Sequence, residues 1–191
     1  MQNQNMSQNS SKITRTFIAI NFPQEIIKEI ARIQSSLSSI KFIGKTTEIE
    51  NLHLTLKFLG EITLQQREEV KSRLSKINLP SFQTEIGSLG IFTHKKSPKI
   101  LWIKINSLQL NKLQKTIDRA LSPLFPKEKR FMSHLTIARI KHVKDIKEFT
   151  DYINSIPIKK LFFKISEFKL FSSELKPFGP IYSEIKSYKL I

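Results

Sequence analysis

Two copies of a His-x-Thr motif are the residues of this sequence best suited to chemistry. His53-Leu54-Thr55 is repeated 81 positions later as His134-Leu135-Thr136. Both copies lie in segments predicted to be strands, where residues i and i+2 point to the same face, so each motif presents an imidazole beside a hydroxyl. If the two pairs face each other across a cleft, one neutral imidazole can accept a proton from an attacking oxygen and the other, protonated, can donate one to a leaving oxygen. This chemistry suits phosphoryl transfer.

The threonines complete that interpretation. The hydroxyls of Thr55 and Thr136 can donate hydrogen bonds to non-bridging phosphate oxygens, where charge must be stabilised. Such a site needs no metal ion. A single His-x-Thr tripeptide is more often an ordinary strand segment, because short motifs occur by chance. Repetition in matching strand context favours the catalytic interpretation.

The strand that holds the first motif shows strict alternation over residues 52–59. This pattern predicts a half-buried strand. It places Phe58 on the apolar core face and Lys57 on the same face as Thr55.

The rest of the chain has the periodicity of a mixed α/β protein. We expect strands at residues 16–22, 52–59, 82–89, 100–105, 131–140, 161–171 and 182–190, and helices at residues 23–40, 63–76, 107–121 and 144–153. The order of elements nearly repeats, and no linker rich in Gly or Pro separates the halves. We therefore expect one domain of two similar lobes over residues 13–191, preceded by a disordered polar tail over residues 1–12.

Composition limits the class of protein. The 191 residues contain no cysteine, which excludes disulfides, thiolate metal sites and a catalytic thiol. The net charge is +16, of which residues 96–191 contribute +12. Such a field favours a polyanionic partner, either a nucleic acid or an anionic membrane surface. No apolar run is long enough to cross a membrane, and the N-terminus does not have the pattern of a secretory signal, so we expect a cytoplasmic protein.

Two longer segments carry a family resemblance. Residues 50–61 (ENLHLTLKFLGE) and 130–139 (RFMSHLTIAR) resemble the two signatures of the bacterial and archaeal RNA 2′,3′-cyclic phosphodiesterases, also called 2′-5′ RNA ligases. This family is part of the two-histidine phosphoesterase superfamily. The resemblance extends from residues 16–20 through 100–102 to 173–182, which leaves only the first dozen residues outside it.

The resemblance implies a bilobal α/β fold of two pseudo-symmetric lobes. Each lobe is an antiparallel sheet flanked by helices, and the active site lies in the central cleft. It also implies hydrolysis of an RNA 2′,3′-cyclic phosphate to a 2′-phosphate without metal or other cofactor, and the reverse, ATP-independent 2′-5′ ligation. By position, His53 is the general acid for the departing O3′, His134 is the base that activates water, and Thr55, Thr136 and Arg139 bind the phosphate.

Two positions depart from the family pattern or from a regular strand. Ser133 stands where the family often has proline, which we expect to affect backbone stiffness rather than chemistry. Strict alternation puts Arg139 on the face opposite His134. The strand must therefore bulge or end before Arg139 if this arginine is to reach the phosphate.

We expect the partner to be an RNA with a 2′,3′-cyclic phosphate end, and tRNA fragments are among the candidates. We expect the protein to be a monomer that does not bind a membrane. Two alternatives remain open at this point: a cyclic phosphodiesterase for a small nucleotide or ADP-ribose cyclic phosphate, and a non-catalytic RNA-binding module. His94 and its basic neighbours are candidates for RNA contact in a loop over residues 94–98. Trp102, the sole tryptophan, is expected in the core.

Overall fold

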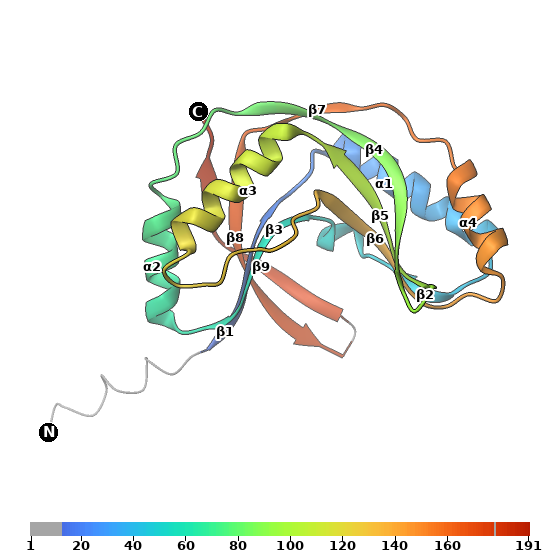
Figure 1. Cartoon of the computed structure of the whole chain (residues 1–191), viewed down its shortest axis with the longest axis horizontal. Coiled ribbons are helices and arrows are strands. Elements are labelled where there is room, and N and C mark those ends of the chain that lie inside the picture. Colours follow the sequence, from blue (N-terminus) through green and yellow to red (C-terminus); the bar gives the residue numbers. More distant parts are fainter. Residues whose placement is uncertain (1–12, 178) are drawn as a thin grey trace, which may run out of the picture.

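The computed structural model describes residues 13–177 and 179–191 (Figure 1); the predicted tail, residues 1–12, lies outside them. The described strands are β1 (Thr14–Ile20), β2 (Ile43–Thr46), β3 (Leu54–Ile62), β4 (Phe82–His94), β5 (Ser97–Asn106), β6 (His134–His142), β7 (Phe162–Ile165), β8 (Glu167–Lys176) and β9 (Gly179–Lys189). The described helices are α1 (Gln24–Ser36), α2 (Leu64–Leu74), α3 (Leu108–Leu121) and α4 (Ile146–Ser155), with short 3₁₀ turns η1 (Leu37–Ser39) and η2 (Ile49–Asn51).

The strands form two antiparallel sheets, as the bilobal prediction requires. One sheet has the order β3-β1-β8-β9 and the other the order β2-β6-β5-β4-β7. Figure 1 shows α2 and α3 beside the sheet that holds β3, and α1 and α4 at the side of the sheet that holds β6. Each His-x-Thr motif therefore belongs to a different sheet, and each sheet is flanked by helices.

The lobes do not correspond to the two halves of the chain. Residues 161–171, which we expected to form one strand, are two strands in different sheets: β7 pairs with β4, and β8 pairs with β1. The closing strands β8 and β9 complete the sheet begun by β1 and β3, while β4 and β5 belong to the other sheet. Each sheet thus contains strands from both the early and the late part of the sequence. The chain therefore passes between the two lobes more than once.

Local sequence signals set the starts of α2 and α3 as predicted. Thr63 begins α2 with a capping box: its hydroxyl accepts from the Gln66 amide at 3.2 Å, and its own amide donates to Gln66 Oε1 at 2.9 Å. Ser107 caps α3. Apolar faces of the helices and inner faces of the sheets join in a continuous core.

Two further segments differ from the prediction. β2 was not expected, because its four residues are exposed and show no alternation; backbone pairing with β6 makes it a strand. Residues 94–98, expected as a loop, form a tight hairpin turn. Lys95 and Lys96 both adopt the left-handed conformation (φ 48° and 67°), which matches the twist of the long hairpin β4–β5.

A β-bulge follows each His-x-Thr motif. In β3, Thr55 pairs with Ala19 and Lys57 with Ile18, so Leu56 is the extra residue. In β6, Thr136 pairs with Trp102 and Ala138 with Leu101, so Ile137 is the extra residue. Each bulge reverses the alternation of the residues that come after it.

The reversal changes which side chains are buried in the core and which are exposed. Lys57 is buried (4% exposed) and Phe58 is 70% exposed, so our prediction for these two residues from strict alternation was wrong. In β6 the same reversal turns Arg139 to the face of Thr136. The predicted irregularity before Arg139 is confirmed: the strand bulges and continues to His142.

The buried ammonium of Lys57 joins three parts of the molecule. It forms an ion pair with Asp118 of α3 and donates to the Pro126 carbonyl at 2.8 Å. The other Asp118 oxygen accepts from the Glu128 amide at 2.9 Å. Strand β3 is thereby tied to α3 and to the segment that leads into His134.

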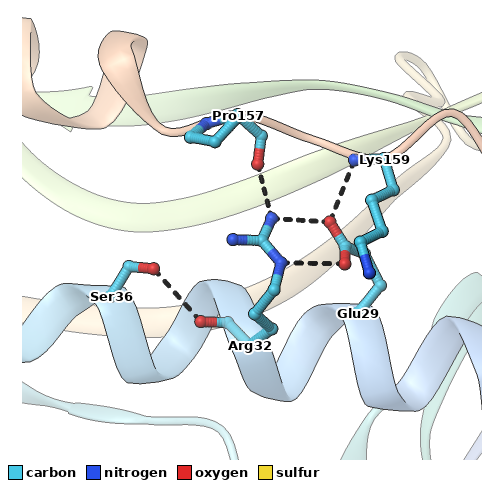
Figure 2. A network of polar contacts seen from close by, with 5 residues as sticks. All are labelled: Glu29, Arg32, Ser36, Pro157 and Lys159. Carbon is cyan, nitrogen blue, oxygen red and sulfur yellow. Dashed lines mark hydrogen bonds and ion pairs between the residues drawn. The ribbon is translucent and has the colours of Figure 1, made fainter.

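A second polar network fastens α1 to the chain between α4 and β7 (Figure 2). Arg32 donates to both carboxylate oxygens of Glu29, at 2.9 and 2.7 Å, and also to the Pro157 carbonyl. Glu29 accepts in addition from the Lys159 amide at 3.0 Å. These hydrogen bonds hold the pKa of the buried Glu29 carboxyl below its usual range despite burial.

We expect Lys57→Met to lower the free energy of unfolding by about 3–5 kcal/mol, because Asp118 then stays buried without its cation. Urea denaturation measures this change. Lys147→Met, at the exposed pair with Asp151, is the matched control and should cost less than about 1 kcal/mol. The double variant Lys57→Met with Asp118→Leu should recover much of the lost free energy of unfolding. If Lys57→Met alone is as stable as the unaltered protein, the buried ion pair does not have the role described.

Candidate active site

Both histidines of the repeated motif are held in the same way. Nδ1 of His53 lies 2.7 Å from the Asn51 carbonyl oxygen, and Nδ1 of His134 lies 2.8 Å from the Met132 carbonyl oxygen. A carbonyl oxygen can only accept, so each Nδ1 carries hydrogen and donates it. Each Nε2 is therefore the atom available for proton transfer.

Strands β3 and β6, which carry the two motifs, contact each other although they belong to different sheets. Burial is the main cause that lowers the pKa of His53, and the charges of Arg139 and His134 lower it further. The hydrogen bond to the Asn51 carbonyl acts in the opposite direction. His134 and Arg139, on the sheet of β6, are thus close enough to His53, on the sheet of β3, for their charges to act on it.

Aromatic rings surround His53. Its ring centroid is 4.9 Å from that of Phe17 and 5.2 Å from that of Tyr182, which meets it edge-on. Phe17 in turn stacks on Phe171 at 5.3 Å and lies 6.2 Å from the exposed Phe58. Sequence reasoning missed Phe17 and Tyr182 as site residues. Alternation in β1 could have shown that Phe17 faces away from its buried neighbour Ile18.

The surroundings of His134 are also aromatic. Its ring lies 5.1 Å from Phe92 and 6.2 Å from Trp102, edge-on in both cases. Trp102 is half-buried on the same face as Thr136, its register partner, so our expectation that it belongs to the core was wrong. The indole lies across Gly90, where a Cβ atom would come within 2.3 Å of the ring, so only glycine leaves room for it.

Hydrogen bonds from outside the strand support the bulge in β6. The carbonyl of Ile137 accepts from the Thr47 amide at 2.9 Å and from Gln34 Nε2 at 2.9 Å. Gln34 Nε2 also donates to the Thr47 carbonyl at 2.8 Å. Helix α1 therefore fixes the backbone that turns Arg139 toward the site.

Ser133 gives the start of β6 a further attachment. Its hydroxyl donates to the Ile105 carbonyl at 2.7 Å, and its carbonyl accepts from the Ile105 amide at 3.1 Å. Proline at this position could not make the first of these bonds. Where the family often has the stiff residue proline, this chain therefore has a serine that forms a hydrogen bond to β5.

Lys104 is a cation of the site that sequence reasoning missed. It is the register partner of His134 on β5, and it is exposed between the buried residues Ile103 and Ile105. Alternation over residues 100–105 could have placed it on the face of Trp102. It adds positive charge beside His134.

The remaining two histidines lie away from the paired motifs. His94 ends β4 and His142 ends β6, both exposed at the end of the sheet opposite His134. In the described part of the chain, no group of three or more His, Asp or Glu side chains is arranged to hold a metal ion. None of the described helices is both long and apolar enough to span a bilayer.

The pKa of His53 generates a prediction about the free protein. Because burial and the Arg139 cation both favour the neutral imidazole, His53 should titrate below 6.5 when its proton shifts are followed by NMR. Arg139→Gln removes a positive charge and should move the midpoint up, as should bound inorganic phosphate. A midpoint at or above 6.5 in the unliganded protein would contradict the burial of this ring.

Comparisons with known proteins agree with the repeat. The family model described as LigT-like phosphoesterase matches twice, over residues 20–102 and 103–182, so each match contains one His-x-Thr motif. An RNA 2′,3′-cyclic phosphodiesterase of Thermotoga maritima is 35% identical over 172 residues, which cover 88% of this chain and 91% of the relative. One from Methanocaldococcus jannaschii is 33% identical and covers 91% and 99%. The crystal structure of TT0787 of Thermus thermophilus has the same fold, with a TM-score of 0.77 at 23% identity over 92% of this chain and 97% of that one.

Proposed function

Because this chain belongs to the LigT-like phosphoesterase family, we propose that it hydrolyses the 2′,3′-cyclic phosphate at the end of an RNA to a 2′-phosphate. One observation carries the proposal: two histidines on different sheets share one electrostatic neighbourhood, and each presents Nε2 through the same carbonyl hydrogen bond at Nδ1. General acid–base catalysis of phosphoryl transfer needs such a pair.

In the proposed reaction, His134 Nε2 takes a proton from water as the water oxygen attacks phosphorus. The bond between phosphorus and O3′ breaks, and His53 Nε2–H donates its proton to the departing O3′. The products are a 2′-phosphate and a free 3′-hydroxyl. Thr55, Thr136 and Arg139 stabilise the charge on the non-bridging oxygens. The carbonyls that accept from each Nδ1 keep both rings in the correct orientation.

The low pKa of His53 is compatible with its role as acid. In the free protein the neutral ring is favoured, but a bound phosphate anion favours the protonated ring. The substrate therefore supplies the charge that allows His53 to act as a proton donor. When a 5′-hydroxyl attacks in place of water, the same bond to O3′ breaks and a 2′-5′ linkage forms without ATP.

An oligonucleotide substrate is favoured by the charge beyond Arg139. Five lysines form what we call the basic sheet end, at the hairpin turn of β4–β5 and the end of β6: Lys95, Lys96, Lys99, Lys141 and Lys144. A strand rise of about 3.3 Å per residue places Lys141 roughly 23 Å from His134. A mononucleotide cannot span that distance, whereas an RNA strand can reach from the site to the basic sheet end.

The histidines are tested by single substitutions. We expect His53→Ala and His134→Ala each to lower kcat for an RNA with a 2′,3′-cyclic phosphate end by at least about 10²–10⁴-fold, because each removes one proton-transfer group. EDTA should have no effect. His142→Ala is the control and should retain full activity. Turnover close to that of the unaltered enzyme in either single variant would overturn the proposed mechanism.

The basic sheet end is tested by charge removal. Lys95→Gln, Lys96→Gln and Lys141→Gln together should raise KM for a ten-nucleotide substrate and flatten its salt dependence, by about 0.7 in log–log slope for each lost phosphate contact. Hydrolysis of a cyclic mononucleotide should not change. Lys76→Gln, Lys112→Gln and Lys115→Gln, in the other lobe, are the matched control.

Two outcomes would favour the alternatives. Equal KM values for the mononucleotide and the oligonucleotide in the unaltered enzyme would favour the small-nucleotide function. Tight, salt-dependent RNA binding without turnover would favour the RNA-binding module. Since one chain supplies both motifs, we also propose that the enzyme acts as a monomer, which light scattering measures.

A further inference from the structure

A pocket of about 230 Å³ opens beside His53, on the side of β8 and β9. Tyr182 is the half-exposed ring of its aromatic wall, and the buried rings of Phe17 and Phe171 lie behind it. Asn21, Glu50 and Glu184 supply the polar groups of the pocket. Pockets for drug-sized ligands have volumes of about 300–1,000 Å³, so this one suits a single planar group better than a whole nucleotide.

We propose that this pocket binds the base of the RNA's 3′-terminal nucleotide and selects bases that carry an exocyclic amino group. The inference rests on the proposed function and adds a specificity to it. Adenine, cytosine and guanine meet the requirement, whereas uracil does not.

The aromatic wall is built to hold a flat ring. Phe17 is buried and fixed by its stack on Phe171, with an interplanar angle of 17°, and Tyr182 meets it edge-on at 4.9 Å. Single-stranded RNA bases are commonly bound by such rigid aromatic side chains. Because Tyr182 also contacts His53, a base bound against this ring lies directly beside the proton donor.

The polar groups give the pocket its selectivity. Ionised carboxylates only accept hydrogen bonds, so they pair with amino groups and repel carbonyl oxygens and phosphates. Glu184 is already paired with Lys169 at 2.7 Å. Glu50 is exposed and has no ion-pair partner among the described residues, so we expect it to bind the amino group. Uracil presents a carbonyl oxygen where cytosine presents its amino group.

The proposed reaction places the terminal base on this side. His53 protonates O3′, so the ribose that carries O3′ must lie next to His53 when the bond breaks. Water attacks from the opposite direction, near His134. The base attached to that ribose is therefore closer to the pocket than to the basic sheet end, which is left for the rest of the RNA strand.

The experiment compares four oligonucleotides that differ only in the 3′-terminal base before the cyclic phosphate. We expect kcat/KM to be at least about 5-fold lower for uracil than for adenine or cytosine, because the uracil carbonyl then faces the Glu50 carboxylate and neither group can donate a hydrogen bond. Glu50→Gln can donate to the uracil carbonyl and should reduce this ratio to near one. Glu25→Gln, exposed on α1 outside this pocket, is the matched control and should keep the ratio.

The outcomes distinguish the two proposals. If none of the four oligonucleotides is hydrolysed, the proposed function itself fails. If all four are hydrolysed with equal kcat/KM, or if Glu50→Gln changes all four by the same factor, the base pocket is overturned while the proposed function stands. A preference for uracil also overturns it.

Discussion

One extra residue directly after each His-x-Thr motif, Leu56 in β3 and Ile137 in β6, determines which side chains the two strands expose beside the histidines. In a regular strand, Lys57 would face the site and Phe58 would face the core. The bulge exchanges them, so that Lys57 is buried and Phe58 is exposed. At the equivalent position of β6 the same exchange turns Arg139 toward the two histidines. The repeat in the sequence is thus a repeat of an irregular backbone, and the irregularity serves the chemistry.

The bulges depend on contacts that come from other parts of the chain. Ile137 is held by the Thr47 amide and by Gln34 of α1, while the Lys57 ammonium holds α3 and the segment before His134. Because β8 and β9 return to the sheet of β1 and β3, neither lobe can move freely from the other. The two histidines are therefore positioned by a core that both lobes share.

Much of this arrangement was predictable from residue types and spacing. The capping box at Thr63, the apolar face of α1 and the half-buried strand of the first motif follow from local patterns, and the need for an irregularity before Arg139 follows from simple alternation. The sheets to which β7 and β8 belong could not be predicted, because residues 161–171 contain no glycine or proline that marks a break, and only long-range pairing divides this segment. Likewise, alternation cannot locate a bulge such as Leu56, whose cause is the burial of Lys57 against Asp118 in a distant helix. The aromatic rings around the two histidines could not be predicted either, because they come from four other strands, β1, β4, β5 and β9, whose pairing is not visible in the sequence.

The central claim is that paired imidazoles direct water to the phosphorus of a 2′,3′-cyclic phosphate and release O3′. The most direct measurement is hydrolysis of a cyclic-phosphate-ended RNA in ¹⁸O-labelled water, with the product position read by ³¹P NMR and the label by mass spectrometry. The account predicts a single product with a 2′-phosphate that carries one ¹⁸O atom and a free 3′-hydroxyl. A 3′-phosphate product, or a 2′-phosphate without the label, would contradict it.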